Sequence, residues 1–398
     1  MAEAPRETWI TGLGIVSCLG EGPQMHWQRL NEPPPRPEMQ AFAPYIVHRL
    51  APLQFDKQIP KKGDQRQMEP WQRIGTYAAG LALDSAGVKG NAGLLARMDM
   101  IVAAGGGERD EAVDSAILSG LPQAEKPGAF LNERLMSDLR PTLFLAQLSN
   151  LLAGNISIVH GVTGSSRTFM GEEAAGVDAV RIALSRIEAG QSDIALVGGA
   201  HNGERKDLLL LYAFAAQALK DAFAPVWERA ARGGGMALGS LGAFLVLEAR
   251  EHALARKARP LARISKVLSD RSKRQPGATT ASLARMWGSL ADRLTPGRTA
   301  VISGATGAEP ATTEERAWLE ALPDVPARAT GTHLGHGFEP QFAMNIALAT
   351  LVIGHERLFP PADSSGVELA MQGPVAQIVV TGVGHWRGEG IALVEAVS

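Results

Sequence analysis

Two histidines and one cysteine are the residues whose types and spacing first suggest chemistry. His333 and His336 form an H-x-x-H pair, and such a pair can hold a metal ion. No acidic residue is spaced along the sequence to complete that site, so we interpret the pair as packed histidines and expect no metal and no cofactor. Cys18 is the single cysteine, which excludes an internal disulfide and a cysteine metal cluster.

A pair of adjacent carboxylates, Glu172 and Glu173, opens the clearest predicted helix, over residues 172–190. Apolar residues follow the pair at helical spacing, and Gly190 ends the pattern. A carboxylate in the first turn of a helix is stabilised through the helix dipole by about 0.3–1 kcal/mol. The two acids therefore have a purely structural interpretation, with which any chemical role of Glu173 competes.

Strands and helices alternate around these residues. Short β-rich or apolar runs predict strands at 8–16, 99–104, 194–200, 261–267, 300–303, 377–381 and 390–394. The 3.6-residue apolar period predicts further helices at 71–83, 280–294 and 339–351. The run 194–200 is continuously apolar, as in a strand that helices cover on both faces, so the sequence predicts an α/β layered core.

The chain divides into two predicted halves at a charged stretch, residues 248–260. We place the N-terminal half at 1–256, with a proline-containing cap or excursion at about 32–70, and the C-terminal half at 257–398. Similar glycine-rich turns follow an early and a late strand, at 11–14 and 381–384. By themselves these turns are weak evidence of duplication, because glycines at strand ends have many uses.

The composition is that of an ordinary globular protein, with 398 residues, of which 45% are hydrophobic and 20% charged. The net charge of −2 gives no reason to expect nucleic acid or an anionic membrane surface as a partner. No apolar run approaches the ~20 residues that a membrane span requires. We therefore expect a cytoplasmic protein without membrane insertion.

Several segments taken together resemble the β-ketoacyl-acyl carrier protein synthases, the type II ketosynthases of the thiolase-like superfamily. The similarity runs from Ile10 to Val394. Its motifs are residues 10–17, 65–68, 161–167, 190–200 and 381–384. The resemblance implies an α/β thiolase-like fold of αβαβα layers, built from two pseudo-duplicated halves. It also implies a dimer, either of identical chains or of two different ones.

In that family a cysteine takes the acyl chain, and two histidines and a lysine assist decarboxylation of the malonyl extender. Alignment without gaps puts Glu173 at the cysteine position and Ala305 at the first histidine position. His333 stands at the second histidine position, with Arg328 at the lysine position. Val383 replaces the phenylalanine that gates the acyl pocket. A carboxylate does not serve thioester exchange as a thiolate does, so independent condensing activity is not expected.

The resemblance also implies an acyl carrier protein as partner, docked through basic residues against an acidic helix of the carrier. Four basic side chains lie near the matching place, namely Lys61, Lys62, Arg66 and Arg73. Ordinary solvation of a surface explains these four residues at least as well.

We favour a non-condensing partner subunit, similar to the chain length factors that pair with a cysteine-containing ketosynthase in a heterodimer. Its pathway would be fatty acid elongation, for example of the very long chains of lipid A, or polyketide elongation. An enzyme is the alternative: a starter-generating decarboxylase, as in relatives with glutamine at the nucleophile position, although an ionised Glu173 would repel the malonyl carboxylate. A weak condensing enzyme that uses His333 is a further alternative.

Overall fold

One continuous mixed sheet of eleven strands runs through the protein, in a computed structural model that describes residues 5–141 and 143–397. In the N-terminal half the strand order is β5-β4-β6-β8-β1. These strands are β1 (Thr8–Ser17), β4 (Asp99–Ala103), β5 (Ser166–Phe169), β6 (Ile194–His201) and β8 (Leu241–Ala249). The long strand β8, which the sequence reasoning did not identify, lies between β6 and β1.

The C-terminal half has the strand order β11-β10-β12-β13-β9. Its strands are β9 (Ala262–Asp270), β10 (Thr299–Ser303), β11 (Ala327–Ala329), β12 (Gln377–Val383) and β13 (Glu389–Glu395). If the five strands of each half are numbered along the chain, their order across the sheet is 3-2-4-5-1 in both halves. The two halves therefore repeat one topology. Residues 8–10 of β1 pair antiparallel with residues 262–264 of β9 and join the halves.

Helices connect these strands, and three two-residue strands lie outside the main order: β2 (Gly20–Glu21), β3 (Val47–His48) and β7 (Leu238–Gly239). The helices are α1 (Gly22–Leu30), α2 (Lys62–Gln67), α3 (Pro70–Ser85), α4 (Ala92–Leu95), α5 (Glu111–Gly120), α6 (Pro127–Ser137), α7 (Leu143–Ala146), α8 (Leu151–His160), α9 (Glu172–Glu188), α10 (Lys206–Phe214), α11 (Arg250–Ala255), α12 (Ala278–Gly288), α13 (Ala311–Glu320), α14 (Gly331–Leu334) and α15 (Gln341–Gly354). None of the described helices combines the length and the apolarity needed to cross a membrane.

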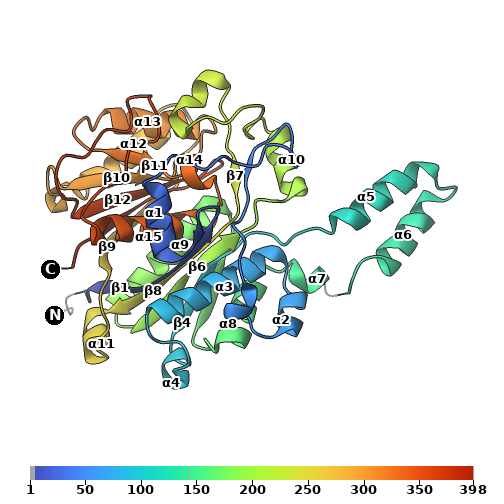
Figure 1. Cartoon of the computed structure of the whole chain (residues 1–398), viewed down its shortest axis with the longest axis horizontal. Coiled ribbons are helices and arrows are strands. Elements are labelled where there is room, and N and C mark those ends of the chain that lie inside the picture. The colour runs from blue at the N-terminus through green and yellow to red at the C-terminus, as the bar shows by residue number, and fades with distance from the viewer. Residues whose placement is uncertain (1–4, 142, 398) are drawn as a thin grey trace.

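Two helices, α9 and α15, form a layer between the two halves of the sheet (Figure 1). α9 packs against β4, β6 and β9, while α15 packs against β8, β12 and α9. Residues 341–350 of α15 are all buried, as expected of a helix surrounded by protein on every side. α3 and α8 cover the outer face of the N-terminal half, and α12 and α13 cover that of the C-terminal half. The α/β layered fold that the sequence predicts is thus confirmed.

The glycine-rich segments at 11–14 and 381–384, predicted as turns, lie within β1 and at the end of β12, where glycine allows close packing of helices on the strands. A Cβ atom at Gly14 of β1 would lie 2.0 Å from the carbonyl oxygen of Ala78, so only glycine allows α3 to approach this closely. A Cβ atom at Gly382 of β12 would lie 3.0 Å from the ring of Phe342 in α15. The two segments do not stand at equivalent places, because β1 is the first strand of its half and β12 is the fourth strand of the other.

Part of the segment predicted as a cap at about 32–70 lies in the core. Ile46, Val47 and Ile59 are buried, and Ile46 packs with Leu219 and Ala237. β3 pairs in parallel with β7. The proline cluster that suggested a surface excursion covers only the first residues of the segment, and apolar residues follow it.

Two helices, α5 and α6, extend away from the layered body on one side (Figure 1). Their exposed side chains include the apolar residues Leu118, Leu135 and Met136. An extension of this kind gains stability when another surface covers its apolar side chains.

Candidate functional site

A strained turn places Glu173 at the start of the central helix α9. β5 ends at Phe169, and Gly171 and Glu172 follow with positive φ angles of 121° and 56°. A residue other than glycine in this region costs of order 1–3 kcal/mol and persists where the surrounding structure holds it. α9 then begins, and Glu173 is buried in its first turn, with 4% of the residue exposed.

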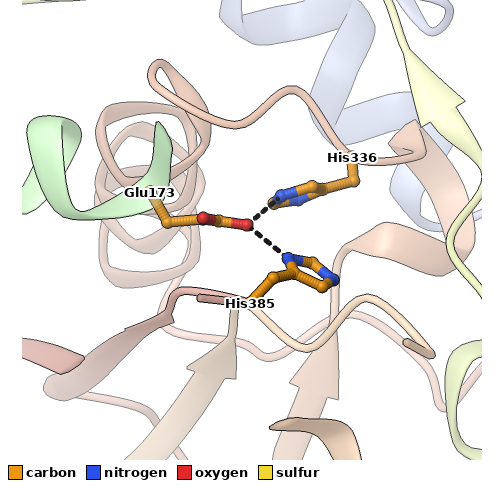
Figure 2. Close-up of side chains that lie close together, drawn as sticks. All are labelled: Glu173, His336 and His385. Atoms are coloured by element: carbon orange, nitrogen blue, oxygen red, sulfur yellow. Dashed lines mark hydrogen bonds and ion pairs between the residues drawn. The ribbon is translucent and has the colours of Figure 1, made fainter. Parts of the chain in front are cut away.

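Two histidines from the C-terminal half meet the Glu173 carboxylate, and we name these three residues the Glu-His-His cluster (Figure 2). Glu173 Oε1 accepts hydrogen bonds from His336 Nε2 at 2.7 Å and from His385 Nδ1 at 2.8 Å. His336 follows α14, and His385 follows β12. All three side chains are buried. The cluster therefore joins the first turn of α9 to two loops of the other half.

Thr306 holds the second ring nitrogen of His385. Its Oγ1 lies 3.2 Å from His385 Nε2 and also accepts a hydrogen bond from the backbone N–H of Ala308, at 3.1 Å. His385 Nδ1 faces Glu173, and its Nε2 is within hydrogen-bonding distance of the Thr306 hydroxyl, which can donate or accept according to the tautomer of the ring. A chain of hydrogen bonds thus runs from Ala308 through Thr306 and His385 to the carboxylate.

The cluster stabilises Glu173 as an anion. Burial opposes the charged form of Glu173, but the attraction and hydrogen bonds of His385 and His336 outweigh it and hold the pKa of the carboxyl far below its usual range. Burial lowers the pKa of His336, and the hydrogen bond and charge of Glu173 only partly offset this. Glu173 is therefore ionised at neutral pH.

Two further acids near the cluster have raised pKa values, opposite to Glu173. Burial, with the charge of Glu173, raises the pKa of Glu172 to about 6. Burial, with the charges of Glu173 and Glu172, raises the pKa of Glu339 to about 7. Glu339 Oε2 lies 4.0 Å from His201 Nδ1, beyond hydrogen-bonding distance. The site thus concentrates carboxyl groups around a single stabilised anion.

A cavity of about 270 Å³ lies beside the Glu-His-His cluster. Glu172, Met170, Leu211, Tyr212 and Phe338 are among the residues that line it. The Phe338 ring meets His336 edge to face at 4.6 Å between centroids, and the Tyr212 ring lies 6.3 Å from that of His385. The cavity therefore reaches side chains that touch the cluster.

The remaining residues aligned with the catalytic set lie in other surroundings. His333 is buried, and its ring meets Phe359 edge to face at 5.8 Å. Burial lowers the pKa of His333 to about 4. Ala305 and Val383 are packed in one apolar cluster on the outer side of the C-terminal half. The structure thus brings Glu173 to His336 and His385, and places His333 against Phe359.

Arg328 is buried and donates hydrogen bonds to backbone carbonyls. Its guanidinium donates to the backbone carbonyls of Phe359 at 2.7 Å and Leu369 at 2.9 Å, and its Nη1 donates to that of Ala327 at 2.6 Å. Burial lowers its pKa to about 10. These bonds hold the segment before α14, which carries His333 and His336.

The basic residues proposed for carrier docking lie on and around α2. Lys61 and Arg66 are exposed, and no ion pair engages either one within the described part of the chain. Lys62 is exposed but pairs with Asp56 at 2.5 Å. Arg73 is half-buried and lies over the ring of Phe55. Two of the four side chains are therefore free to meet a partner.

Sequence reasoning missed the role of His385 and gave His336 no partner. His385 follows the glycine-rich turn at 381–384, where only the loss of the gate residue was noted. The signal that could have found it is a histidine in a loop that borders the nucleophile position. No acid is spaced along the sequence to join the His333–His336 pair, but the fold brings Glu173, 163 residues earlier in the chain, to His336 alone.

The same three residues can hold a metal ion. One ligand atom from each of Glu173, His336 and His385 lies within 4.8 Å of the others. Two imidazoles and one carboxylate form a ligand set that suits zinc and other first-row divalent metals.

Comparisons with known proteins agree with this fold. Residues 3–253 match the family described as Beta-ketoacyl synthase, N-terminal domain. The chain is 27% identical over 278 residues to a 3-oxoacyl-[acyl-carrier-protein] synthase 2 of Vibrio cholerae, a match that covers 65% of this chain and 62% of that protein. The chain thus spans less than two thirds of the length of the curated relatives it matches.

Two solved structures share the whole fold. The ishigamide ketosynthase/chain length factor has a TM-score of 0.79 at 19% identity, over 99% of this chain and 100% of that one. A type II PKS acyl-carrier protein in complex with its ketosynthase bound to the hexaketide has a TM-score of 0.72 at 16% identity, with the same coverage. With the family match over residues 3–253, the layered fold and its doubled topology, these findings show that the chain belongs to the beta-ketoacyl synthase family.

Proposed function

We propose that this chain is a non-condensing ketosynthase-like subunit that pairs with a cysteine-containing β-ketoacyl-acyl carrier protein synthase. The observation that carries the proposal is Glu173, buried at the start of α9 and bound by His336 and His385. A carboxylate held as an anion by two hydrogen bonds is a weak nucleophile toward a thioester, and an acyl-carboxylate anhydride would hydrolyse. A cysteine thiolate on a partner chain would supply the missing nucleophile.

The single cysteine does not replace the missing nucleophile. Burial raises the pKa of Cys18 to about 12, so its thiol stays protonated. Its Sγ donates a hydrogen bond to the backbone carbonyl of His333 at 3.2 Å. A half-buried thiol that stays protonated is a poor nucleophile, which supports a non-condensing role.

A partner chain is supported by the edge of the sheet beside the site. β5 ends the strand order, and Ser166 and Arg167 on it are exposed. Exposed apolar side chains lie on α5 and α6, on α7, directly after β5 and on α10: Leu118, Met136, Phe144, Leu145, Met170, Leu210, Leu211 and Phe214. An open sheet edge and exposed apolar side chains are both typical of a protein interface.

The cavity beside the cluster supports a shared acyl pocket. Met170 and Leu211 line the cavity and are also exposed, so the cavity opens toward the same apolar surface. A partner that covers this surface would close the cavity from one side and so set the length of acyl chain it admits. We propose an acyl carrier protein as second partner, docked near Lys61 and Arg66. The pathway would be fatty acid elongation, including the very long chains of lipid A, or polyketide elongation.

The decarboxylase alternative is disfavoured by the charge at the site. An ionised Glu173 repels the carboxylate of a malonyl thioester, and the low pKa of Glu173 keeps it ionised. Ala305 offers no side-chain donor to an enolate oxygen.

The test is a pull-down and turnover assay of the purified chain, alone and mixed with the cysteine-containing ketosynthase encoded nearest to it. We expect the two chains to co-purify, and the lone chain to release no CO₂ from malonyl carrier thioester and to form no condensation product. Turnover by the lone chain that is lost in Glu173→Ala would overturn the proposal. Glu172→Gln, a change at the neighbouring acid, is the matched control.

A further inference from the structure

We propose that the Glu-His-His cluster is a binding site for a divalent transition metal ion of the zinc type. The proposal goes beyond the partner-subunit function, and neither depends on the other. Three separate elements deliver the ligands: the first turn of α9, the loop after α14 and the loop after β12. Such convergence in a buried place suits a site that binds one ion from several directions.

The spacing of the ligand atoms is close to that of a metal site. Ligand atoms around a tetrahedral zinc lie about 3.3 Å apart, since the zinc bonds to nitrogen and oxygen measure about 2.0–2.1 Å. Glu173 Oε1 lies 2.7 Å and 2.8 Å from the two histidine nitrogens. Side-chain shifts of about half an ångström would therefore admit the ion in place of the shared protons.

A second observation points to a ligand independently of this spacing. The other carboxylate oxygen, Glu173 Oε2, is buried and has no hydrogen-bond partner among the described residues. A buried carboxylate oxygen without a partner loses its solvation without compensation. A cation bound at the carboxylate would compensate it.

The surroundings can accept the proton that metal binding moves. An imidazole binds a metal through a nitrogen that carries no proton, so His385 would carry its proton on Nε2 instead of Nδ1. Thr306 Oγ1 lies 3.2 Å from that nitrogen and can accept the hydrogen bond. This matches the rule that a histidine ligand donates its other N–H to a fixed partner.

A solvent-accessible cavity adjoins the site without reaching the three ligands themselves. Its lining includes Glu172 and Glu339, so a cation that enters meets acidic side chains. Phe338 lines the cavity and contacts His336, which places the ligands just behind the cavity wall. Three protein ligands leave a fourth coordination position for water or another small ligand, as in zinc sites that are not purely structural.

The test uses the full-length chain, stripped with a chelator and then dialysed against Zn²⁺ or Co²⁺. We expect one equivalent of zinc by atomic emission, and a visible Co²⁺ absorption typical of low coordination number. Glu173→Gln and His385→Gln should each weaken zinc binding at least tenfold. His355→Gln changes an exposed histidine elsewhere in the chain and should leave binding unchanged.

Wild-type chain that binds no zinc, or Glu173→Gln and His385→Gln variants that bind it as tightly as wild type, would overturn the proposal. A measurement on wild type alone guards against variants that fold poorly. Zinc at a hundredfold excess over its dissociation constant should raise the midpoint of thermal unfolding, and the chelator should reverse the rise. An unchanged midpoint would contradict the site.

Discussion

The burial of Glu173 gives this single residue a large effect on stability. Its carboxylate accepts hydrogen bonds from both histidines, and all three side chains are removed from water. Removing one partner of a buried ion pair costs more than the pair contributes, because the other groups are left without a partner. The acid is therefore constrained by the fold whether or not it takes part in chemistry.

Replacing Glu173 should reveal this constraint. We expect Glu173→Ala to lower the free energy of unfolding by about 3 kcal/mol, because two buried donors lose their acceptor. Glu173→Gln keeps the shape and one acceptor oxygen, and should cost about 1–2 kcal/mol. Urea unfolding followed by circular dichroism measures both. Glu172→Gln should change the value by less than about 1 kcal/mol, and equal losses in all three variants would contradict the ion pair.

Two buried histidines outside the Glu-His-His cluster should determine how the free energy of unfolding changes in acid. Burial lowers the pKa of His26 and of His160 to about 4. The folded-state pKa lies below the unfolded value of about 6.5, so protons bind the unfolded chain first. The stabilisation is complete above about pH 6.5 and is lost as the pH falls toward 4.

Each such histidine should therefore lower the free energy of unfolding by about 1 kcal/mol between pH 7 and pH 5.5, while Glu172 and Glu339, whose pKa values are raised, oppose this fall. Urea unfolding at pH 7.5, 6.5 and 5.5 gives the slope of the free energy of unfolding against pH. His160→Gln should make the slope shallower, since one proton-binding group is removed from the unfolded chain. An identical slope in the variant would show that His160 is not neutral in the folded protein.

At the site, sequence reasoning could identify positions but not contacts. The position of Glu173 followed from its place between two glycine-rich motifs, and the fold puts it at the start of α9. The meeting of Glu173 with His336 and His385 spans 163 and 212 residues. No local spacing encodes such contacts, because they depend on how the two halves pack around α9 and α15.

Among the elements, β5 and α10 carry the proposed interface. β5 is the last strand at one end of the sheet. α10 carries apolar side chains on both faces, since Leu209 and Tyr212 are buried while Leu210, Leu211 and Phe214 are exposed. An apolar face left open to water on a helix favours association. The sequence predicted neither α10 nor its exposure, since a helix that is apolar on several sides has no clear periodicity.

A charged substitution on α10 tests this interface. We expect Leu211→Arg combined with Phe214→Arg to weaken the complex with the cysteine-containing ketosynthase at least tenfold, because the arginines would lose hydration at the interface. Analytical ultracentrifugation or pull-down measures the complex. Leu254→Arg on α11 alters an equally exposed leucine outside the proposed interface, and should have no effect. Equal binding by both variants would place the partner elsewhere.

For the whole molecule, the sequence predicted the layered α/β class and most of the strands that build it. β4, β6, β10 and β12 were all predicted within a few residues, because buried strands form apolar runs bounded by glycine. β8 was missed, although it is fully buried, and the segment at 32–70 was expected at the surface. Both depend on pairing between distant segments, as β8 pairs with β1 and β6.

Docking of an acyl carrier protein should depend on charge near α2. We expect Lys61→Glu combined with Arg66→Glu to weaken carrier binding several-fold at low salt, and the difference to shrink as salt rises. Fluorescence anisotropy with a labelled carrier measures both effects. Lys257→Glu makes the same kind of change at an exposed residue just after α11, away from α2 in Figure 1, and serves as control. A loss of binding in the control alone would place the docking surface elsewhere.

The division of labour between two subunits is tested most directly by asking which chain takes the acyl group. The complex with the cysteine-containing ketosynthase would be incubated with acyl carrier thioester, and each subunit weighed by intact mass spectrometry. We expect the acyl adduct on the partner chain and none on this chain, since Glu173 is held as an anion by two histidines. An adduct on this chain that disappears in Glu173→Ala would contradict the non-condensing role.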